Sequence, residues 1–236
     1  MIPYTYSPCI LSPKMAKFLT RATLGFHAEA DLMCRCFPHS MLLRLPSLSP
    51  KITVIDFAAQ AFGQPCPFPV YVDDENTIAT DIYIVKNGRV QGCMTNRELA
   101  AKMRLPLTGN ARIPSPGAGP EIYMRNTALL PWKDSFSNML ESVCNGFYLV
   151  DGYGAEGDEN GDYACHITEG YHIRNGTICD PIYNCVVWGC GIEFLTSICM
   201  VGDDFTWFEE TFEDRPLAPQ VFGAPTITAR VNIGQY

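Results

Sequence analysis

The sequence predicts an α+β fold in which an antiparallel sheet carries a few helices. Asn87-Gly88 and Asn175-Gly176 each stand between runs of β-type residues, and Asn-Gly in that setting is the strongest short signal for a hairpin. Apolar residues at helical spacing are concentrated near the start of the chain and in three shorter stretches. A chain with two hairpins and few helices fits an antiparallel α+β arrangement.

Residues 12–36 are predicted to form the first and longest helix. Ser12 is a suitable N-cap, and Pro13 fits the first helical position. Pro38 follows and ends the helix. The buried stripe would consist of apolar residues spaced three or four apart for most of its length: Met15, Leu19, Ala22, Phe26 and Met33.

The remaining elements follow from turn signals and periodicity. In chain order we expect a linker at 44–50, a strand-rich region from Lys51, a hairpin at 81–94, a helix at 96–103, a Pro/Gly loop at 114–120, a helix at 135–145, a hairpin at 163–182, a helix at 191–200, and loop and strand at 219–234.

The composition of the chain disfavours several classes of protein. The chain has 236 residues, of which 47% are hydrophobic and 18% are charged, so it can bury a core. Its net charge is −8 and it has no Lys/Arg block, which disfavours a nucleic-acid partner. It has no apolar run of about 20 residues, so we expect no membrane span. The start lacks the pattern of a signal peptide, so we expect a cytoplasmic protein whose 11 cysteines are mostly reduced.

Five segments in order resemble the TldD/PmbA family. They are "LTGNARIP", "EIYMRNTALLPWKDSFSNMLESVCNGFYLVDGYG", "GDYACHITEGYHIRNGTICDPI", "SICMVGDDFTWF" and "FGAPTITARVNIG". They are similar to the family's Pro-Thr-Gly-Asn-[AG]-Arg element, its Arg-x-Thr-Asn-Thr segment with the following helix, its Glu-[GA]-Tyr strand, its Val-Gly-[ND]-Asp segment and its closing strand. Each motif is weak alone, but five in the family's order are specific together.

The resemblance implies the β-rich sheet or barrel of the family's C-terminal domain. Family members are about twice as long, so the chain resembles their C-terminal half only, without the N-terminal α/β domain. On this basis we expect two regions: residues 1–45, with the helix that resembles the family's metal motif, and residues 46–236, the β-rich domain.

The same resemblance implies a metallopeptidase site, but the residues needed for it are replaced. The family carries His-Glu-x-x-x-His on a helix, and these positions fall on Arg21, Ala22 and Phe26, ahead of Glu29 and Asp31. Arg is a permanent cation, while Ala and Phe carry no lone pair for a metal. The family's late Cys also has no counterpart in "DDFTWFEETFEDRP". We therefore expect no catalytic residue and no metal at this site, with Phe26 filling the empty pocket from the stripe of Leu19 and Ala22.

A different zinc site is the alternative. On a straight helix, His27, Asp31 and Cys34 lie within about 60° of one another, and all three side chains can bind zinc. The same residues also fit a half-exposed helix face on which His27 and Asp31 form a weak i,i+4 pair.

The first functional hypothesis is a non-catalytic subunit that processes a peptide or peptide-like natural product. The family includes pairs in which one subunit carries the metal and the other lacks it. We therefore expect a homodimer, or a heterodimer with a longer, metal-bearing TldD-like subunit. The polar residues retained in the family's motifs are the expected substrate-binding residues: Asn110, Arg112, Arg125, Asn126 and Glu169.

Two other hypotheses stay open. One is an enzyme of changed chemistry, such as a tailoring or hydrolytic enzyme of secondary metabolism, that uses the retained cleft. The groups available to it are His27, Glu29, Asp31 and Cys34, or Arg112, Arg125 and Asn126. The other is a purely structural or regulatory binding module, which predicts no turnover of any small molecule.

Overall fold

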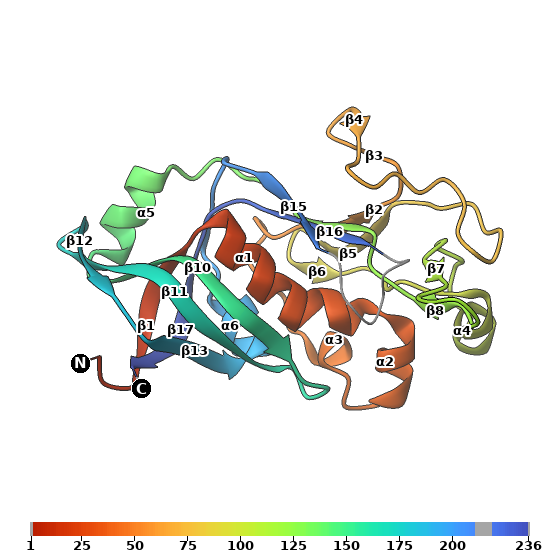
Figure 1. Ribbon diagram of the computed structural model, residues 1–236, viewed down its shortest axis with the longest axis horizontal. Helices are drawn as coiled ribbons and strands as arrows, with labels where there is room; N and C mark the ends of the chain where they lie inside the picture. Colours follow the sequence, from red (N-terminus) through yellow and green to blue (C-terminus); the bar gives the residue numbers. More distant parts are fainter. Residues whose placement is uncertain (1, 211–218, 236) are drawn as a thin grey trace.

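A computed structural model describes residues 2–210 and 219–235 of the chain. It confirms the predicted α+β class: a closed barrel and a second sheet lie at opposite ends of the molecule, with helices between and around them (Figure 1). The two described ends of the chain meet at the barrel, where the backbone N–H of Ile2 donates to Oε1 of Gln235 at 3.0 Å.

The barrel closes because its last strand pairs with its first. Successive neighbours are β1 (Thr5–Leu11), β10 (Gly146–Gly157), β11 (Asp162–Arg174), β13 (Cys185–Cys190) and β17 (Ile227–Gln235). Strand β17 also pairs with β1 along its length, from Thr5↔Ile233 to Leu11↔Ile227. The β1–β10 pair is parallel, and the other four pairs are antiparallel. Two further strands extend the sheet: β12 (Thr177–Ile182) beside β11 and β14 (Met200–Val201) beside β17.

The second sheet has six strands. Their order is β15 (Thr206–Glu210), β16 (Gln220–Ala224), β9 (Asn126–Leu129), β2 (Val54–Phe57), β5 (Ile82–Lys86) and β6 (Arg89–Val90). Two small two-stranded sheets flank it: β3 (Gln60–Ala61) with β4 (Gln64–Pro65), and β7 (Ala111–Arg112) with β8 (Glu121–Ile122).

The helices are short. They are α1 (Pro13–Thr20), α2 (Ala30–Arg35), α3 (Met41–Arg44), α4 (Arg97–Met103), α5 (Phe136–Val143) and α6 (Gly191–Ser197). The helices expected at 96–103, 135–145 and 191–200 are thereby confirmed. Both Asn-Gly hairpins are confirmed as well, since Asn87, Gly88, Asn175 and Gly176 all have positive φ, as the turn type requires.

The single helix predicted over residues 12–36 is wrong. Its start is as expected, since the Ser12 hydroxyl accepts the N–H of Met15 at 3.2 Å. Helix α1 then passes into a π-helical turn (Arg21–Gly25) and a 3₁₀ turn (Phe26–Ala28), and the backbone becomes extended at Glu29. The break is stabilised from outside the segment, because Met94 exchanges backbone hydrogen bonds with Ala28 and Ala30. Such a distant pairing leaves no periodic signal in the sequence.

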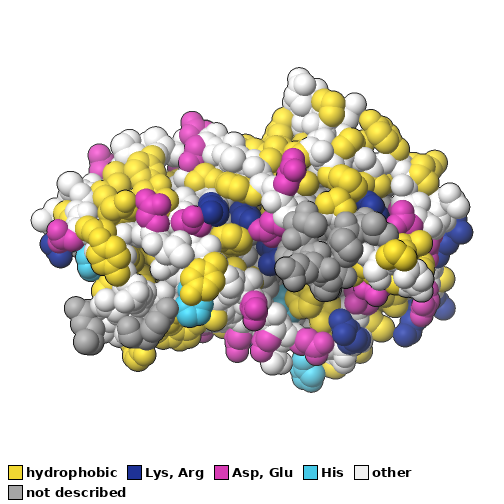
Figure 2. Space-filling model, in the orientation of Figure 1, with side chains coloured by type: hydrophobic (Ala, Val, Ile, Leu, Met, Phe, Trp, Pro, Cys, Tyr) yellow, Lys and Arg dark blue, Asp and Glu magenta, His cyan; other side chains and the backbone are white. Residues whose placement is uncertain are grey.

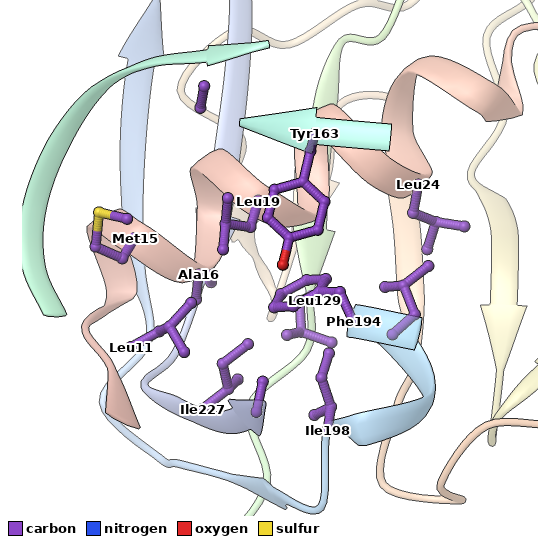
Figure 3. Close-up of a cluster of buried hydrophobic side chains, with 14 of the residues drawn as sticks. Leu11, Met15, Ala16, Leu19, Leu24, Leu129, Tyr163, Phe194, Ile198 and Ile227 are labelled. Atoms are coloured by element: carbon purple, nitrogen blue, oxygen red, sulfur yellow. The ribbon is translucent and has the colours of Figure 1, made fainter. Parts of the chain in front are cut away.

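One hydrophobic core joins the start of the chain to the rest. Leu11, Met15 and Leu19 pack with Phe194 and Ile227 in a single buried cluster (Figure 3). Helix α1 lies between β10 of the barrel and β16 of the second sheet (Figure 1). The division into residues 1–45 and 46–236 therefore stays a prediction about folding units. In the described ranges, none of the helices is long and apolar enough to cross a membrane.

Candidate functional site

Two basic side chains of the first helical segment converge on one carboxylate. The Lys17 ammonium lies on α1 and forms an ion pair with Oε1 of Glu210, the last residue of β15. The Arg21 guanidinium, one turn further on, has its Nε 3.7 Å from the other oxygen of Glu210. Lys17 is only 4% exposed, so the pair is held away from solvent. We call these three residues the Lys17 cluster.

The surroundings of Lys17 disfavour its charged form. Burial, together with the nearby Arg21 and Lys14, lowers the pKa of the Lys17 amine to about 7. The ring of Phe18 lies 3.8 Å from the ammonium nitrogen and that of Phe208 lies 5.4 Å from it. Contact with the Glu210 carboxylate and the charge of Asp151 favour the protonated amine, but burial outweighs the effect of Asp151.

A cleft of about 540 Å³ opens beside this segment, between α2, α4 and the wall that contains β8. The cleft is shaped by the bridge between Glu29 and Met94, which fixes α2 beside the residues that lead into α4. Three groups of residues line it: Phe26, Glu29, Asp31, Cys34 and Arg35 on one side, the N-cap Asn96 with Glu98, Leu99 and Lys102 of α4 on the second, and Pro120, Glu121, Ile122 and Tyr123 on the third.

Three of the predicted substrate-binding residues belong to buried structural networks. Asp56 on β2 accepts the Arg125 Nε–H, the Asn110 amide and the Thr127 hydroxyl, each at 2.8 Å. Arg125 is 1% exposed. Its other side-chain N–H groups donate to backbone carbonyls, among them that of Thr80 at 2.8 Å. This geometry assigns Asn110 and Arg125 to holding loops together, and their contact with a substrate stays a prediction.

Asn126 is bonded in the same manner. Its amide donates to the carbonyl of Phe68 at 2.7 Å and accepts the Phe68 N–H at 3.1 Å, so it fastens the loop before β5 to β9. Arg112 lies on β7, with its Nε 3.4 Å from Asp74 and its guanidinium over the ring of Phe68. Glu169 is exposed on β11 of the barrel and accepts the Tyr171 hydroxyl at 3.0 Å. The five residues thus do not form one pocket.

The alternative zinc ligands do not converge either. His27 is buried, and burial lowers the pKa of its imidazole against the effect of the nearby Asp158. Asp31 and Cys34 line the cleft, whereas His27 does not. The break at Glu29 removes the straight helix on which the prediction depended. Within residues 2–210 and 219–235, no group of three His, Cys, Asp or Glu side chains could hold a metal ion.

The sequence model of a family described as the PmbA/TldA metallopeptidase C-terminal domain matches residues 5–234. The chain belongs to this family. A protein named zinc metalloprotease TldD homolog, from Saccharolobus solfataricus, is 31% identical over 231 residues, which cover 97% of this chain and 52% of that protein. A protein named metalloprotease, from Methanothermobacter thermautotrophicus, is 30% identical over 201 residues, which cover 83% of this chain and 42% of that protein.

A solved crystal structure has a similar fold. The crystal structure of TldE from Thermococcus kodakarensis matches with a TM-score of 0.80 at 18% identity, over 98% of this chain and 51% of that one. At this identity the similarity shows the fold alone. The chain therefore has the TldD/PmbA C-terminal fold and spans about half the length of the relatives it matches.

The residues that the resemblance places at the family's motif positions are not metal-binding types, and the loss of the metal site stays a prediction. The motif positions assigned from the resemblance hold Arg21, Ala22 and Phe26, and Arg21 is directed at Glu210. A divalent cation there would meet the Lys17 and Arg21 charges and no imidazole. The late Cys segment lies partly outside the described residues, from residue 211 onward.

Phe26 does not lie on the buried stripe predicted for a regular helix, whereas its filling of an empty metal pocket stays a prediction. Phe26 is half-buried and lines the cleft, apart from the buried cluster that contains Leu19. The π-helical and 3₁₀ turns change the rotation per residue, so Phe26 leaves the stripe that a regular helix would have given it.

Sequence reasoning missed Lys17, Glu210 and Asp56. Lys17 and Arg21 are like charges four residues apart, and such a pair destabilises a helix unless an anion lies between the two side chains. This spacing was the sequence signal for a nearby carboxylate. Asp56 is a lone acid in the apolar run "VIDF", and a fully buried acid requires donors around it.

Proposed function

We propose that this chain is a non-catalytic, peptide-binding subunit that acts with a longer, metal-bearing relative. Its substrate would be a peptide or a peptide-like natural product. The Lys17 cluster is the observation that carries the proposal, because it contains Arg21, which the family resemblance places at a metal-ligand position, and Lys17, one turn before it.

The chemistry of the cluster supports a loss of metal-dependent hydrolysis. A metallopeptidase needs ligands for the ion and a base for the attacking water. Here the position of the base is Ala22, and Lys17 with Arg21 supplies two cations next to one carboxylate. An ion pair of this kind joins α1 to β15 without a metal.

Exposed apolar side chains support a partner. Figure 2 shows hydrophobic side chains over the projecting β3–β4 hairpin and near α5 and β12. Phe62 lies in the turn of that hairpin, and Tyr71, Val72 and Ile78 lie in the loop that follows β4, where Tyr71 and Ile78 are 67% and 75% exposed. Phe136 begins α5 and Tyr183 follows β12, and both side chains are exposed. Exposed apolar groups of this kind are typical of protein–protein interfaces.

A changed chemistry is the second candidate, and one observation favours it. Glu29, Asp31 and Cys34 line a single cleft, so a buried acid and a thiol would lie near a substrate bound there. In this case the chain alone would turn over a substrate, and its activity would not depend on a partner's metal.

Reconstitution separates the two candidates. The chain, purified without a His-tag, is mixed with the longer TldD-like protein of the same organism, and cleavage of a peptide library is followed by mass spectrometry. The proposal predicts no cleavage by the chain alone and a gain when it is added to its partner. Changing a metal ligand of the partner should abolish that gain. Cleavage by the chain alone would contradict the proposal, and cleavage in the presence of a chelator would favour the changed chemistry.

A further inference from the structure

The cleft between α2 and α4 combines an apolar wall with an excess of carboxylates. Leu99 and Ile122 are buried and, with Phe26, form an aliphatic and aromatic surface. Its volume of about 540 Å³ is within the range of pockets that hold a small organic ligand. An apolar surface of this size suits the methylene stem of a long side chain.

The net charge of the residues that line the cleft favours a positively charged ligand. Four lining residues are acidic (Glu29, Asp31, Glu98 and Glu121) and two are basic (Arg35 and Lys102), which leaves an excess of two negative charges. The two basic side chains are exposed at the rim, and Arg35 reaches Asp31 at 3.4 Å.

The surrounding structure fixes two of the acidic residues in the cleft lining. Glu29 is only 4% exposed, and the bridge of its backbone to Met94 fixes its position. Glu121 is oriented by the Tyr123 hydroxyl, which donates to it at 2.6 Å. A carboxylate held beside an apolar wall interacts more strongly with a cation than one in open solvent.

We propose that this cleft binds the basic side chain of a peptide, with the aliphatic stem along Leu99 and Ile122 and the cationic head toward Glu29 and Glu98. Phe26 contributes a ring face to the same cation. The inference rests on the proposed peptide-binding function and adds a side-chain preference to it. The Lys17 cluster lies outside the cleft lining, whereas Phe26, Glu29 and Asp31 of the lining belong to the segment that resembles the family's metal motif.

Matched peptides test the preference. Fluorescein-labelled peptides of one sequence, with a central Lys, Arg, norleucine or Glu, are titrated with the full chain, and binding is followed by anisotropy. The Lys and Arg peptides should bind about tenfold more tightly than the norleucine peptide, whose side chain has the aliphatic stem without the charge. A tenfold difference in affinity corresponds to one charge-assisted contact. The difference should shrink in about 0.5 M NaCl. Equal binding of the Lys and norleucine peptides would overturn the inference.

Variants locate the site. Glu98→Gln, on the exposed start of α4, should reduce the Lys preference severalfold, and Glu29→Gln should reduce it further. Glu141→Gln, an exposed residue of α5 far from the cleft lining, is the control and should retain the preference. Because Glu29 is buried, circular dichroism checks its fold, and Glu98→Gln tests the inference even if Glu29→Gln unfolds. A Lys preference that survives Glu98→Gln unchanged would contradict this site.

The two proposals fail in different ways. If no peptide of the series binds, the peptide-binding function itself is contradicted. If peptides bind with no preference for a basic residue, only the side-chain inference is contradicted.

Discussion

Lys17 and Glu210 form a buried ion pair that joins α1 to the end of β15. The residues are 193 positions apart in the sequence, and the contact ties the first helix of the chain to the edge of the second sheet. Burying two charges is costly, and a pair in this setting adds little net stability, but loss of one partner leaves the other charge uncompensated.

Removing one partner of this pair should therefore cost more than removing both. Lys17→Met is expected to lower the free energy of unfolding by about 1–3 kcal/mol, because among the described residues Glu210 then keeps only the ion pair with Arg21, at 3.7 Å. Lys17→Met with Glu210→Met should recover wild-type stability to within about 1 kcal/mol. Urea unfolding measures both.

The exposed pair of Lys14 and Asp151 is the matched control. Lys14 lies on the same helix as Lys17, and its Nζ is 2.7 Å from Oδ2 of Asp151 on β10, but the two side chains are 43% and 32% exposed. Lys14→Met should change stability by less than about 1 kcal/mol. A double Lys17/Glu210 variant less stable than Lys17→Met would show that the pair is net stabilising and contradict this account.

The lowered pKa of Lys17 predicts a dependence of stability on pH. The Lys17 pKa is about 7 in the folded chain and 10.5 for an ordinary lysine, so the unfolded chain binds more protons between these values. The free energy of unfolding should therefore rise with pH across this window, relative to the Lys17→Met/Glu210→Met variant, in which the same other groups titrate. A constant difference between the two proteins from pH 7 to 10.5 would contradict the lowered pKa.

Asp56 should be among the most sensitive positions of the second sheet. Asp56→Asn removes the anion that faces the buried Arg125 guanidinium, so we expect a loss of about 3–5 kcal/mol in urea unfolding. Asp180→Asn is the control, because its pair with Arg174 is more than half exposed on both sides and should contribute less than about 1 kcal/mol. Similar losses in the two variants would rule out a special role for Asp56.

The two Asn-Gly turns should respond differently to the same change. Gly88 and Gly176 both have positive φ, but a Cβ on Gly88 would lie 2.3 Å from the carbonyl oxygen of Leu48, whereas the nearest atom to a Cβ on Gly176 is 3.5 Å away. Gly176→Ala should cost about 1–2 kcal/mol from the backbone alone, and Gly88→Ala should cost clearly more. Thermal unfolding of the pair checks this, and equal losses would show that the Leu48 segment moves aside freely.

Features of the fold that depend on neighbouring residues were predictable from the sequence, whereas features that depend on contacts between distant segments were not. The turns at Asn87-Gly88 and Asn175-Gly176 and the caps at Ser12 and Asn96 were predictable, because each depends on a few neighbouring residues. The break at Glu29 depends on Met94, and the barrel closes through β1, a strand that the sequence analysis did not predict.

The candidate site was predictable only in part. The family motifs identified Arg125 and Asn126 as residues that matter, but their partners Asp56 and Phe68 come from distant segments, and these partners make them structural. The motif positions Arg21, Ala22 and Phe26 could be read from the sequence. The carboxylate that pairs with Lys17 and Arg21 could not, because Glu210 lies at the far end of the chain.

Zinc content tests the central claim most directly. The chain, purified without a His-tag, is incubated with zinc, dialysed and measured by elemental mass spectrometry beside a metal-bearing TldD-like relative treated in the same way. The account predicts no stoichiometric zinc in the wild-type chain, because the family resemblance places Arg21 at a ligand position and Lys17 lies one turn before it. About one zinc per chain retained through dialysis, as in the relative, would contradict it.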